Sequence, residues 1–181
     1  MIAYLVHGFN IKDGGAGTTD RLVPLLERRG YKPVEIDYGY FGLGRVRMCN
    51  HGASKILASI VEPGSIAIGH SNGCAILRDA ARFGAKFQHV TLINPALDED
   101  ADFPFAASVN VWHSPTDVAT LASRFLFRHP WGSMGRFGYS GDSLVFENYN
   151  EDVIFKDSVG HSGVFLRHRL ERVLDELQAR L

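Results

Sequence analysis

Short apolar runs alternate along this chain with longer segments of helical period. The apolar runs predict five strands, at residues 2–6, 33–38, 65–69, 89–93 and 109–112. A further apolar run at 153–155 is interpreted as extended chain. Strands that alternate with helices are typical of a mostly parallel sheet with helices on both faces. The pattern therefore predicts an α/β fold built as a three-layer sandwich.

The segments between these runs repeat apolar residues every three or four positions, as amphipathic helices do. The first helix is expected to start near Thr19 and Asp20 and to stop at Gly30. Two more helices are predicted over 48–61 and over about 72–83. The last helix keeps one face apolar over four turns, formed by Leu166, Leu170, Val173, Leu174, Leu177 and Leu181.

The segment 124–150 breaks this rhythm, because it holds several aromatic residues and glycines without a regular period. Long irregular segments in compact domains are often binding loops or lids. The alternative is a loop that only packs its own aromatic side chains. The first interpretation makes Trp131, Phe137 and Tyr139 candidates for substrate contacts, with Asn10 near the first strand, and it favours apolar acyl groups.

Length and composition fit one globular domain over residues 1–181, since 45% of the 181 residues are hydrophobic and 22% are charged. Lys plus Arg is 19 and Asp plus Glu is 20, for a net charge of -1. Without a basic excess or cluster, a nucleic-acid partner is not expected. The two cysteines both fall in predicted helices and do not form a disulfide framework.

Targeting and cofactor motifs are missing from the sequence. The apolar N-terminal run is too short for a signal peptide and lacks a basic region before it. No run approaches the roughly 20 apolar residues of a membrane span. Neither phosphate-binding glycine motifs nor paired zinc-ligand motifs occur. We therefore expect a cytoplasmic protein with no membrane span, metal or cofactor, either a monomer or a small homo-oligomer.

Residues 69–73 read Gly-His-Ser-Asn-Gly and match the pattern G-x-S-x-G between a predicted strand and a predicted helix. That context holds a serine on a sharp turn, with its hydroxyl above the sheet edge and helix N–H groups beside it. Gly69 and Gly73 suit a turn in which backbones lie too close for a Cβ atom. Ser71 is therefore a candidate nucleophile. The alternative is an ordinary turn in which Ser71 only caps the helix.

A nucleophilic serine needs a base, and the base needs an orienting acid; in this arrangement the chain order is Ser, acid, His. Asp117 comes just past the predicted strand 109–112 and so lies at the same sheet edge as Ser71. It can also cap a helix over 118–125, and the two roles are compatible. The fallback acids follow the preceding strand: Asp98, Glu99, Asp100 and Asp102.

His161 is the candidate base, because it lies in a glycine-flanked loop just before the last helix. His113, beside the turn that carries Asp117, is a weaker candidate for the base. The remaining histidines considered are interpreted as surface or core residues: His51, His89, His129 and His168.

An oxyanion hole takes one N–H from the residue after the nucleophile and another from the loop after an early strand. The first of these is Asn72. The first strand ends in His-Gly-Phe-Asn at residues 7–10, so Phe9 is the expected second donor and Asn10 the neighbouring alternative. A plain turn at the end of a strand would account for the same residues.

Taken in order, these four points resemble the α/β-hydrolase family of serine hydrolases, above all its small, lid-poor bacterial members, whose elbows often read G-H-S-x-G-C as residues 69–74 do. The resemblance spans nearly the whole chain and implies Ser71 as nucleophile, His161 as base and Asp117 as orienting acid. Two features depart from the family. The stretch from Asp117 to His161 is long for so small a member, and Asn72 stands where an apolar residue is common.

The sequence thus predicts a serine hydrolase that cleaves a carboxylic ester, or a related acyl bond of a small-molecule substrate, through an acyl-serine intermediate. A thioesterase or an acyltransferase would use the same three residues. A different class is a non-catalytic protein of the same fold that binds a ligand through its aromatic segment.

Overall fold

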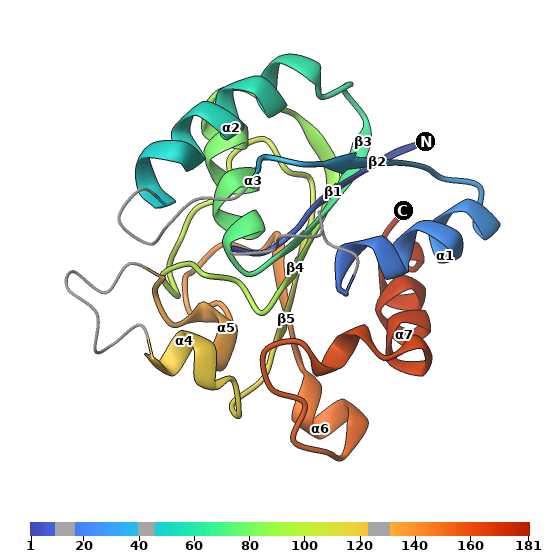
Figure 1. Cartoon of the computed structure of the whole chain (residues 1–181), viewed down its shortest axis with the longest axis vertical. Coiled ribbons are helices and arrows are strands. Elements are labelled where there is room, and N and C mark those ends of the chain that lie inside the picture. The colour runs from blue at the N-terminus through green and yellow to red at the C-terminus, as the bar shows by residue number, and fades with distance from the viewer. Residues whose placement is uncertain (10–16, 40–45, 123–130) are drawn as a thin grey trace.

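Figure 1 shows the computed structural model, in which residues 1–9, 17–39, 46–122 and 131–181 are described. Six strands form one sheet in the order β2-β1-β3-β4-β5-β6, and every neighbouring pair is parallel. The strands are β1 Ile2–Val6, β2 Lys32–Ile36, β3 Ser65–His70, β4 Phe87–Ile93, β5 Val109–His113 and β6 Phe146–Asn150. The five predicted strands are confirmed to within one or two residues at their ends.

The prediction for the last part of the sheet was wrong in two places. Part of the segment taken as irregular forms α5 (Met134–Phe137) and then strand β6, which pairs with β5 at the edge of the sheet. The run 153–155 is not extended but belongs to the helix α6, Glu151–Phe155. The side chain of Asn150 caps this helix by accepting a hydrogen bond from Val153 N at 3.2 Å.

Helices cover both faces of the sheet (Figure 1). A short 3₁₀ turn at Thr19–Leu22, α1 (Val23–Arg28) and α7 (Arg167–Gln178) pack on one face, while α2 (Val46–Ile60) and α3 (Asn72–Arg82) pack on the other. Two shorter elements, α4 (Val118–Ala122) and the 3₁₀ turn Gly163–Phe165, complete the described elements. The three-layer α/β architecture predicted from the sequence is confirmed.

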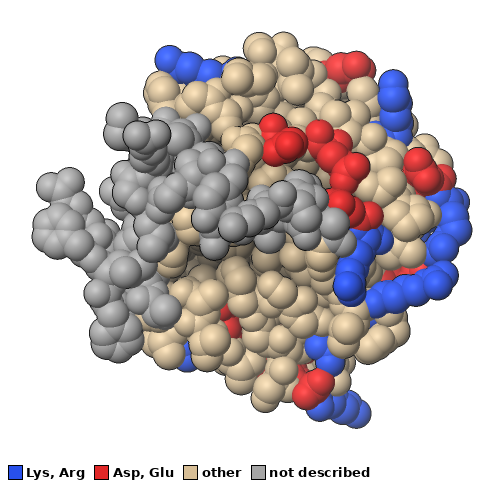
Figure 2. Space-filling view, viewed as in Figure 1, with Lys and Arg blue, Asp and Glu red and all other residues tan. Residues whose placement is uncertain are grey.

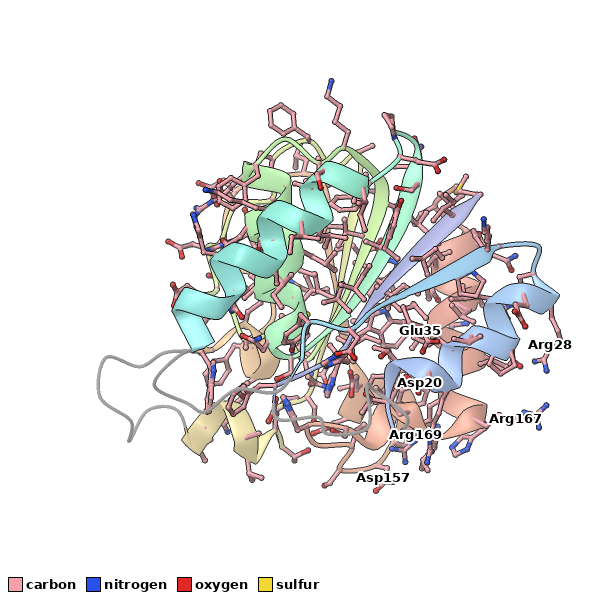
Figure 3. The ribbon with its side chains drawn as sticks, turned by 45° about the horizontal axis from the view of Figure 1, so that its top comes forward. Asp20, Arg28, Glu35, Asp157, Arg167 and Arg169 are labelled. Carbon is pink, nitrogen blue, oxygen red and sulfur yellow. The ribbon has the colours of Figure 1, made fainter. Side chains whose placement is uncertain are left out.

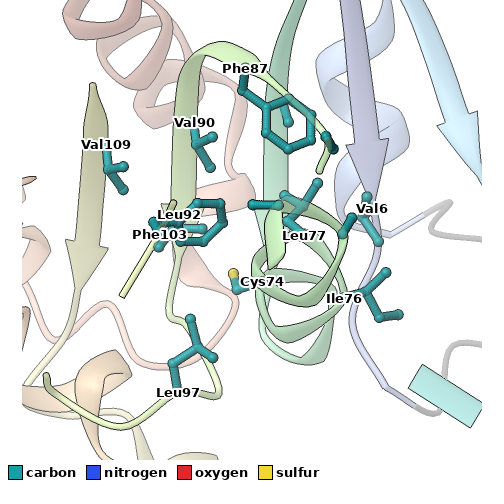
Figure 4. Close-up of a cluster of buried hydrophobic side chains, with 14 of the residues drawn as sticks. Val6, Cys74, Ile76, Leu77, Phe87, Val90, Leu92, Leu97, Phe103 and Val109 are labelled. Carbon is teal, nitrogen blue, oxygen red and sulfur yellow. The ribbon is translucent and has the colours of Figure 1, made fainter. Parts of the chain in front are cut away.

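The core follows the two-residue period of the strands. In β1, Ala3 and Leu5 pack with the α1 and α7 side of the core, whereas Tyr4 and Val6 pack with the α2 and α3 side. Figure 4 shows this second cluster, in which Leu77 of α3 lies near Val6. Because both faces of the central strands are buried, these strands read as continuous apolar runs rather than as an alternation.

The last helix packs on the sheet with the central residues of its predicted apolar face. The residues of that face with no exposed surface are Leu170, Val173, Leu174 and Leu177. Leu166 and Leu181, at the two ends, remain 45% and 46% exposed. The helix therefore packs against the sheet over its central turns.

On the side of α1 and α7, acidic and basic side chains are mixed (Figure 2). Arg28 and Arg29 both pair with Glu171, and Arg29 also pairs with Asp175. Among the described residues, no helix combines the length and the apolar character that a bilayer span requires.

Candidate active site

Ser71 lies in the turn between β3 and α3 with φ 51° and ψ -119°, in the positive-φ region that L-residues rarely adopt. Such a conformation costs on the order of 1–3 kcal/mol and persists only where the surroundings hold it. Here the Ser71 N–H donates to Ile93 O at 3.0 Å, and its carbonyl accepts from the N–H groups of Cys74 and Ala96, each at 3.1 Å. The turn is thus fixed by hydrogen bonds to the end of β4 and to the loop after it.

The glycines on either side of Ser71 are required by close packing. A Cβ atom on Gly73 would lie 2.2 Å from Val6 O, and one on Gly69 would lie 2.8 Å from Leu77 Cδ1 and 3.0 Å from Cys74 N. Gly73 therefore lets the start of α3 approach the end of β1. This approach also brings the loop after β1, with Phe9, to the same end of the sheet as Ser71.

Asp117 and His161 are joined by a hydrogen bond. Nδ1 of His161 donates to Oδ2 of Asp117 at 2.7 Å, and the Asp117 side chain has no exposed surface. The other carboxylate oxygen of Asp117 accepts from the N–H groups of Ala119 at 2.9 Å and Thr120 at 3.1 Å. The residue thus caps α4 and orients the imidazole at once, as its two compatible roles require.

Ser71 and His161 line one cavity of about 180 Å³, whose other walls are Phe9, Ala96, Ala119, Thr120 and Trp131. The hydrogen bond to Asp117 occupies Nδ1 of His161, which leaves Nε2 as the ring nitrogen available to a serine hydroxyl. The structure therefore brings a serine, an imidazole and a buried carboxylate together at the carboxyl ends of the strands.

The other predicted site residues are placed as follows. Asn72 is the first residue of α3, so its N–H has no acceptor one turn earlier in the helix. Phe9 and Trp131 pack ring to ring with centroids 5.9 Å apart. Phe137 is 51% exposed, and Tyr139 stacks on Phe146, so neither lines the cavity. Asn10 lies outside the described residues.

The competing residues make other contacts. Asp102 pairs with Arg82, and Glu99 accepts a hydrogen bond from Ser133. Nδ1 of His113 lies 3.1 Å from the carbonyl oxygen of Arg136. In the part of the chain that the structure describes, no three His, Cys, Asp or Glu side chains gather as metal ligands would.

No protein-family model matches the sequence, and no curated protein matches it. Solved structures do. The chain aligns over 99% of its length with the mouse α/β hydrolase domain-containing protein 10 (TM-score 0.63, 12% identity, 90% of that chain). It aligns over 99% with an extracellular α/β-hydrolase from a Paenibacillus species (TM-score 0.58, 10% identity, 98% of that chain). It aligns over 98% with a YdeN-like hydrolase from Pectobacterium atrosepticum (TM-score 0.54, 17% identity, 89% of that chain).

The chain has the α/β-hydrolase fold. In this α/β-hydrolase-fold protein, β3 and α3 form the strand-turn-helix unit that carries Ser71, while Asp117 follows β5 and His161 follows β6. The order of these residues along the chain is the one expected for the fold.

A hydrogen-bond network that the sequence does not reveal joins two segments of the site. One is the turn after β5, residues 114–117, which carries Asp117 (the acid turn). The other is the loop 159–163, which carries His161 (the histidine loop). The carboxylate of Asp152 accepts from Ser114 Oγ at 2.7 Å, Thr116 Oγ1 at 2.9 Å and Val159 N at 3.0 Å. The N–H of Gly160 in turn donates to Ser114 Oγ at 3.0 Å. Although burial acts to raise it, these hydrogen bonds lower the pKa of Asp152.

His70 also contacts the loop that carries His161. Its Nε2 donates to the carbonyl oxygen of His161 at 3.0 Å, and its side chain is buried beside Gly8. Burial, followed by the neighbouring His161, lowers the pKa of His70 to about 3. His70 therefore stays neutral and acts on the loop as a hydrogen-bond donor.

A buried amide, Asn94, and a buried acid, Glu151, lie next to the same loop. Nδ2 of Asn94 lies 3.1 Å from Oε1 of Glu151 and 3.4 Å from the carbonyl oxygen of Gly160. Burial raises the pKa of Glu151 to about 8. Glu151 is therefore protonated at neutral pH, while Asp152 next to it is ionised.

Arg169 of α7 fixes the far end of the histidine loop. Its guanidinium donates to Asp157 Oδ2 at 2.6 Å and to the carbonyl oxygen of Gly163 at 3.1 Å. Figure 3 shows Arg169 and Asp157 together at this end of α7. Hydrogen bonds from outside the loop thus hold Val159 at one end of it, His161 in the middle and Gly163 at the other end.

Proposed function

We propose that this protein is a serine hydrolase that cleaves carboxylic esters through an acyl-serine intermediate. The observation that carries the proposal is the 2.7 Å hydrogen bond from His161 to the buried Asp117, beside a cavity that Ser71 also lines. A serine hydroxyl is inert until a base removes its proton, and this arrangement supplies an oriented base.

In the first half of the reaction, Nε2 of His161 takes the Ser71 hydroxyl proton as Oγ attacks the acyl carbon. Asp117 holds the imidazole in the tautomer that accepts at Nε2 and stabilises the imidazolium that forms. The tetrahedral oxyanion accepts hydrogen bonds from the N–H groups of Asn72 and Phe9. Collapse breaks the bond to the leaving group, which departs with the proton from Nε2.

The acyl-serine is then hydrolysed by the same groups. Water gives a proton to Nε2 of His161 and adds to the acyl carbon, and the oxyanion forms in the same place. Collapse releases the carboxylic acid and returns the proton to Oγ of Ser71. The positive φ of Ser71 supports this assignment, because the turn projects Oγ from the sheet edge.

Hydrolysis of p-nitrophenyl acetate tests the proposal. The wild-type protein is expected to release p-nitrophenol, and Ser71→Ala is expected to lower kcat by about 10⁶-fold. Circular dichroism and thermal unfolding of Ser71→Ala check that the variant is folded. A folded wild-type protein that is no faster than Ser71→Ala would favour a non-catalytic binding protein of this fold.

A further inference from the structure

A second cavity adjoins the one that holds Ser71 and His161. Its volume is about 330 Å³, and it shares two wall residues with the smaller cavity, Ala96 and Trp131. Neither Ser71 nor His161 lines it. A molecule bound at Ser71 can therefore extend past Ala96 and Trp131 into a space that takes no part in the proton transfers.

The larger cavity is a groove that runs along α3 away from the nucleophile. Asn72, Ala75 and Asp79 lie at intervals of three and four residues, and so on one face of the helix. At a rise of 1.5 Å per residue, the seven steps from Asn72 to Asp79 span about 10 Å. The groove thus has room for an extended chain rather than for a small acyl group alone.

The position of His161 indicates which part of a substrate the groove takes. In the proposed reaction the leaving group collects its proton from His161, so the leaving group lies on the His161 side of the scissile bond. His161 lines only the smaller cavity, together with Ala119 and Thr120 of α4. The acyl chain is therefore the part directed toward the groove along α3.

The polar side chains that line the groove include both hydrogen-bond donors and hydrogen-bond acceptors. The buried amides of Asn50 and Asn72 bond to one another at 2.8 and 3.0 Å and present a polar wall. The guanidinium of Arg78 is bound by the neighbouring carboxylate of Asp79. Across the groove, the exposed carboxylate of Asp98 has no hydrogen bond or ion pair among the described residues.

We propose that the groove between α3 and the loop after β4 binds the acyl chain of the substrate, and that it selects chains that carry a neutral hydrogen-bonding group, such as a hydroxyl, near their far end. The inference rests on the proposed ester hydrolysis and names its substrate class. It also replaces the preference for apolar acyl groups that the aromatic segment suggested. An acyl chain that ends in a carboxylate is disfavoured, because the groove holds two carboxylates, those of Asp79 and Asp98, against the one guanidinium of Arg78.

Three p-nitrophenyl esters of equal acyl length test the chemistry: the octanoate, the 8-hydroxyoctanoate and the half-ester of octanedioic acid. The groove predicts the highest kcat/KM for the hydroxyl chain, roughly fivefold above the alkyl chain, as one neutral hydrogen bond gives. The carboxylate chain is expected to be the slowest. An alkyl ester hydrolysed as fast as the hydroxyl ester, or faster, would overturn the inference.

Ala75→Leu tests the location, because a larger side chain there fills the groove. The ratio of kcat/KM for the 8-hydroxyoctanoate to that for the acetate is expected to fall about tenfold or more. Ala179→Leu, the same change at an exposed position after α7, is the control and leaves the ratio unchanged. An unchanged ratio in Ala75→Leu contradicts the groove. A wild-type protein that hydrolyses the acetate no faster than Ser71→Ala would instead contradict the proposed function itself.

Discussion

The carboxylate of Asp152 accepts a hydrogen bond from the hydroxyl of Ser114 at 2.7 Å, and so ties the start of α6 to the turn that carries Asp117. The same carboxylate accepts from Val159 N, two residues before His161. One acid outside the proposed catalytic set thus sets the distance between the acid turn and the histidine loop. This relationship leads to the first prediction.

Asp152→Ala is expected to lower kcat for p-nitrophenyl acetate by about 10-fold to 100-fold, because the His161 loop loses its fixed position relative to Asp117. Because the buried hydroxyl of Ser114 loses this acceptor, the free energy of unfolding is also expected to fall by about 1–3 kcal/mol. Asp102→Ala, which removes an exposed partner of Arg82, is the matched control. If the two variants had equal kcat, Asp152 would have no positioning role.

Glu151→Gln is expected to change the pH dependence of stability. The pKa of Glu151 is about 8 in the folded protein and about 4.3 in an unfolded chain, so the unfolded state loses this proton first. The contribution of Glu151 to the stability of the wild type is therefore expected to fall as the pH rises from about 4 to about 8. Gln keeps the neutral form throughout.

The measurement for Glu151→Gln is the free energy of unfolding in urea at pH 5 and at pH 8. Relative to the wild type, the free energy of unfolding of the variant should rise between pH 5 and pH 8, by an amount on the order of a few kcal/mol. A difference between variant and wild type that stays constant with pH would show that Glu151 is ionised in the folded protein.

Substitution of the proposed base and substitution of its orienting acid should lower kcat by different amounts. His161→Ala is expected to lower kcat by about 10⁶-fold, as Ser71→Ala does, because the residues act as a unit. Asp117→Asn is expected to lower it by about 10⁴-fold, since the asparagine favours the wrong tautomer of the imidazole. Steady-state kinetics with a p-nitrophenyl ester measures both. A loss below tenfold in His161→Ala would remove that residue from the role of base.

Two glycine substitutions should have opposite effects on stability. Gly73→Ala places a Cβ atom 2.2 Å from Val6 O and 2.5 Å from His7 O, so the variant is expected to unfold at a much lower temperature or to fail to fold. Gly52 lies in α2 with nothing within 4 Å of such an atom. Gly52→Ala is therefore expected to raise the free energy of unfolding by about 0.5–1 kcal/mol. Thermal melts compare the pair, and equal Tm values would contradict the packing described for Gly73.

The central part of the fold could be predicted from the sequence, because strands buried on both faces read as continuous apolar runs. Strand β6 has another pattern: it lies at the sheet edge, and four of its five residues are only partly buried. The run 153–155 resembled a strand for the opposite reason, since its residues are apolar and include β-branched ones. What decides for a helix is the cap at Asn150 and the ionised acid in the first turn, Asp152.

The candidate site also has a part that could be predicted from the sequence and a part that could not. Ser71, Asp117 and His161 could be chosen because each has a local sequence context, namely a turn between glycines, the end of a strand and a loop before a helix. The supporting contacts have no such signal: His70 stands in the same motif as Ser71, but nothing in the motif indicates its hydrogen bond to the loop of His161. Asp152 and His70 act through hydrogen bonds to segments 7 to 91 residues away along the chain, and only the folded sheet edge brings these groups together.

The most direct test of the account is covalent labelling by a fluorophosphonate probe, followed by peptide mass spectrometry. The account predicts one label per chain, on Ser71, with labelling abolished in Ser71→Ala and strongly slowed in His161→Ala. A folded wild-type protein that takes up no label, or takes it up on a serine other than Ser71, would contradict the assignment of Ser71 as the nucleophile.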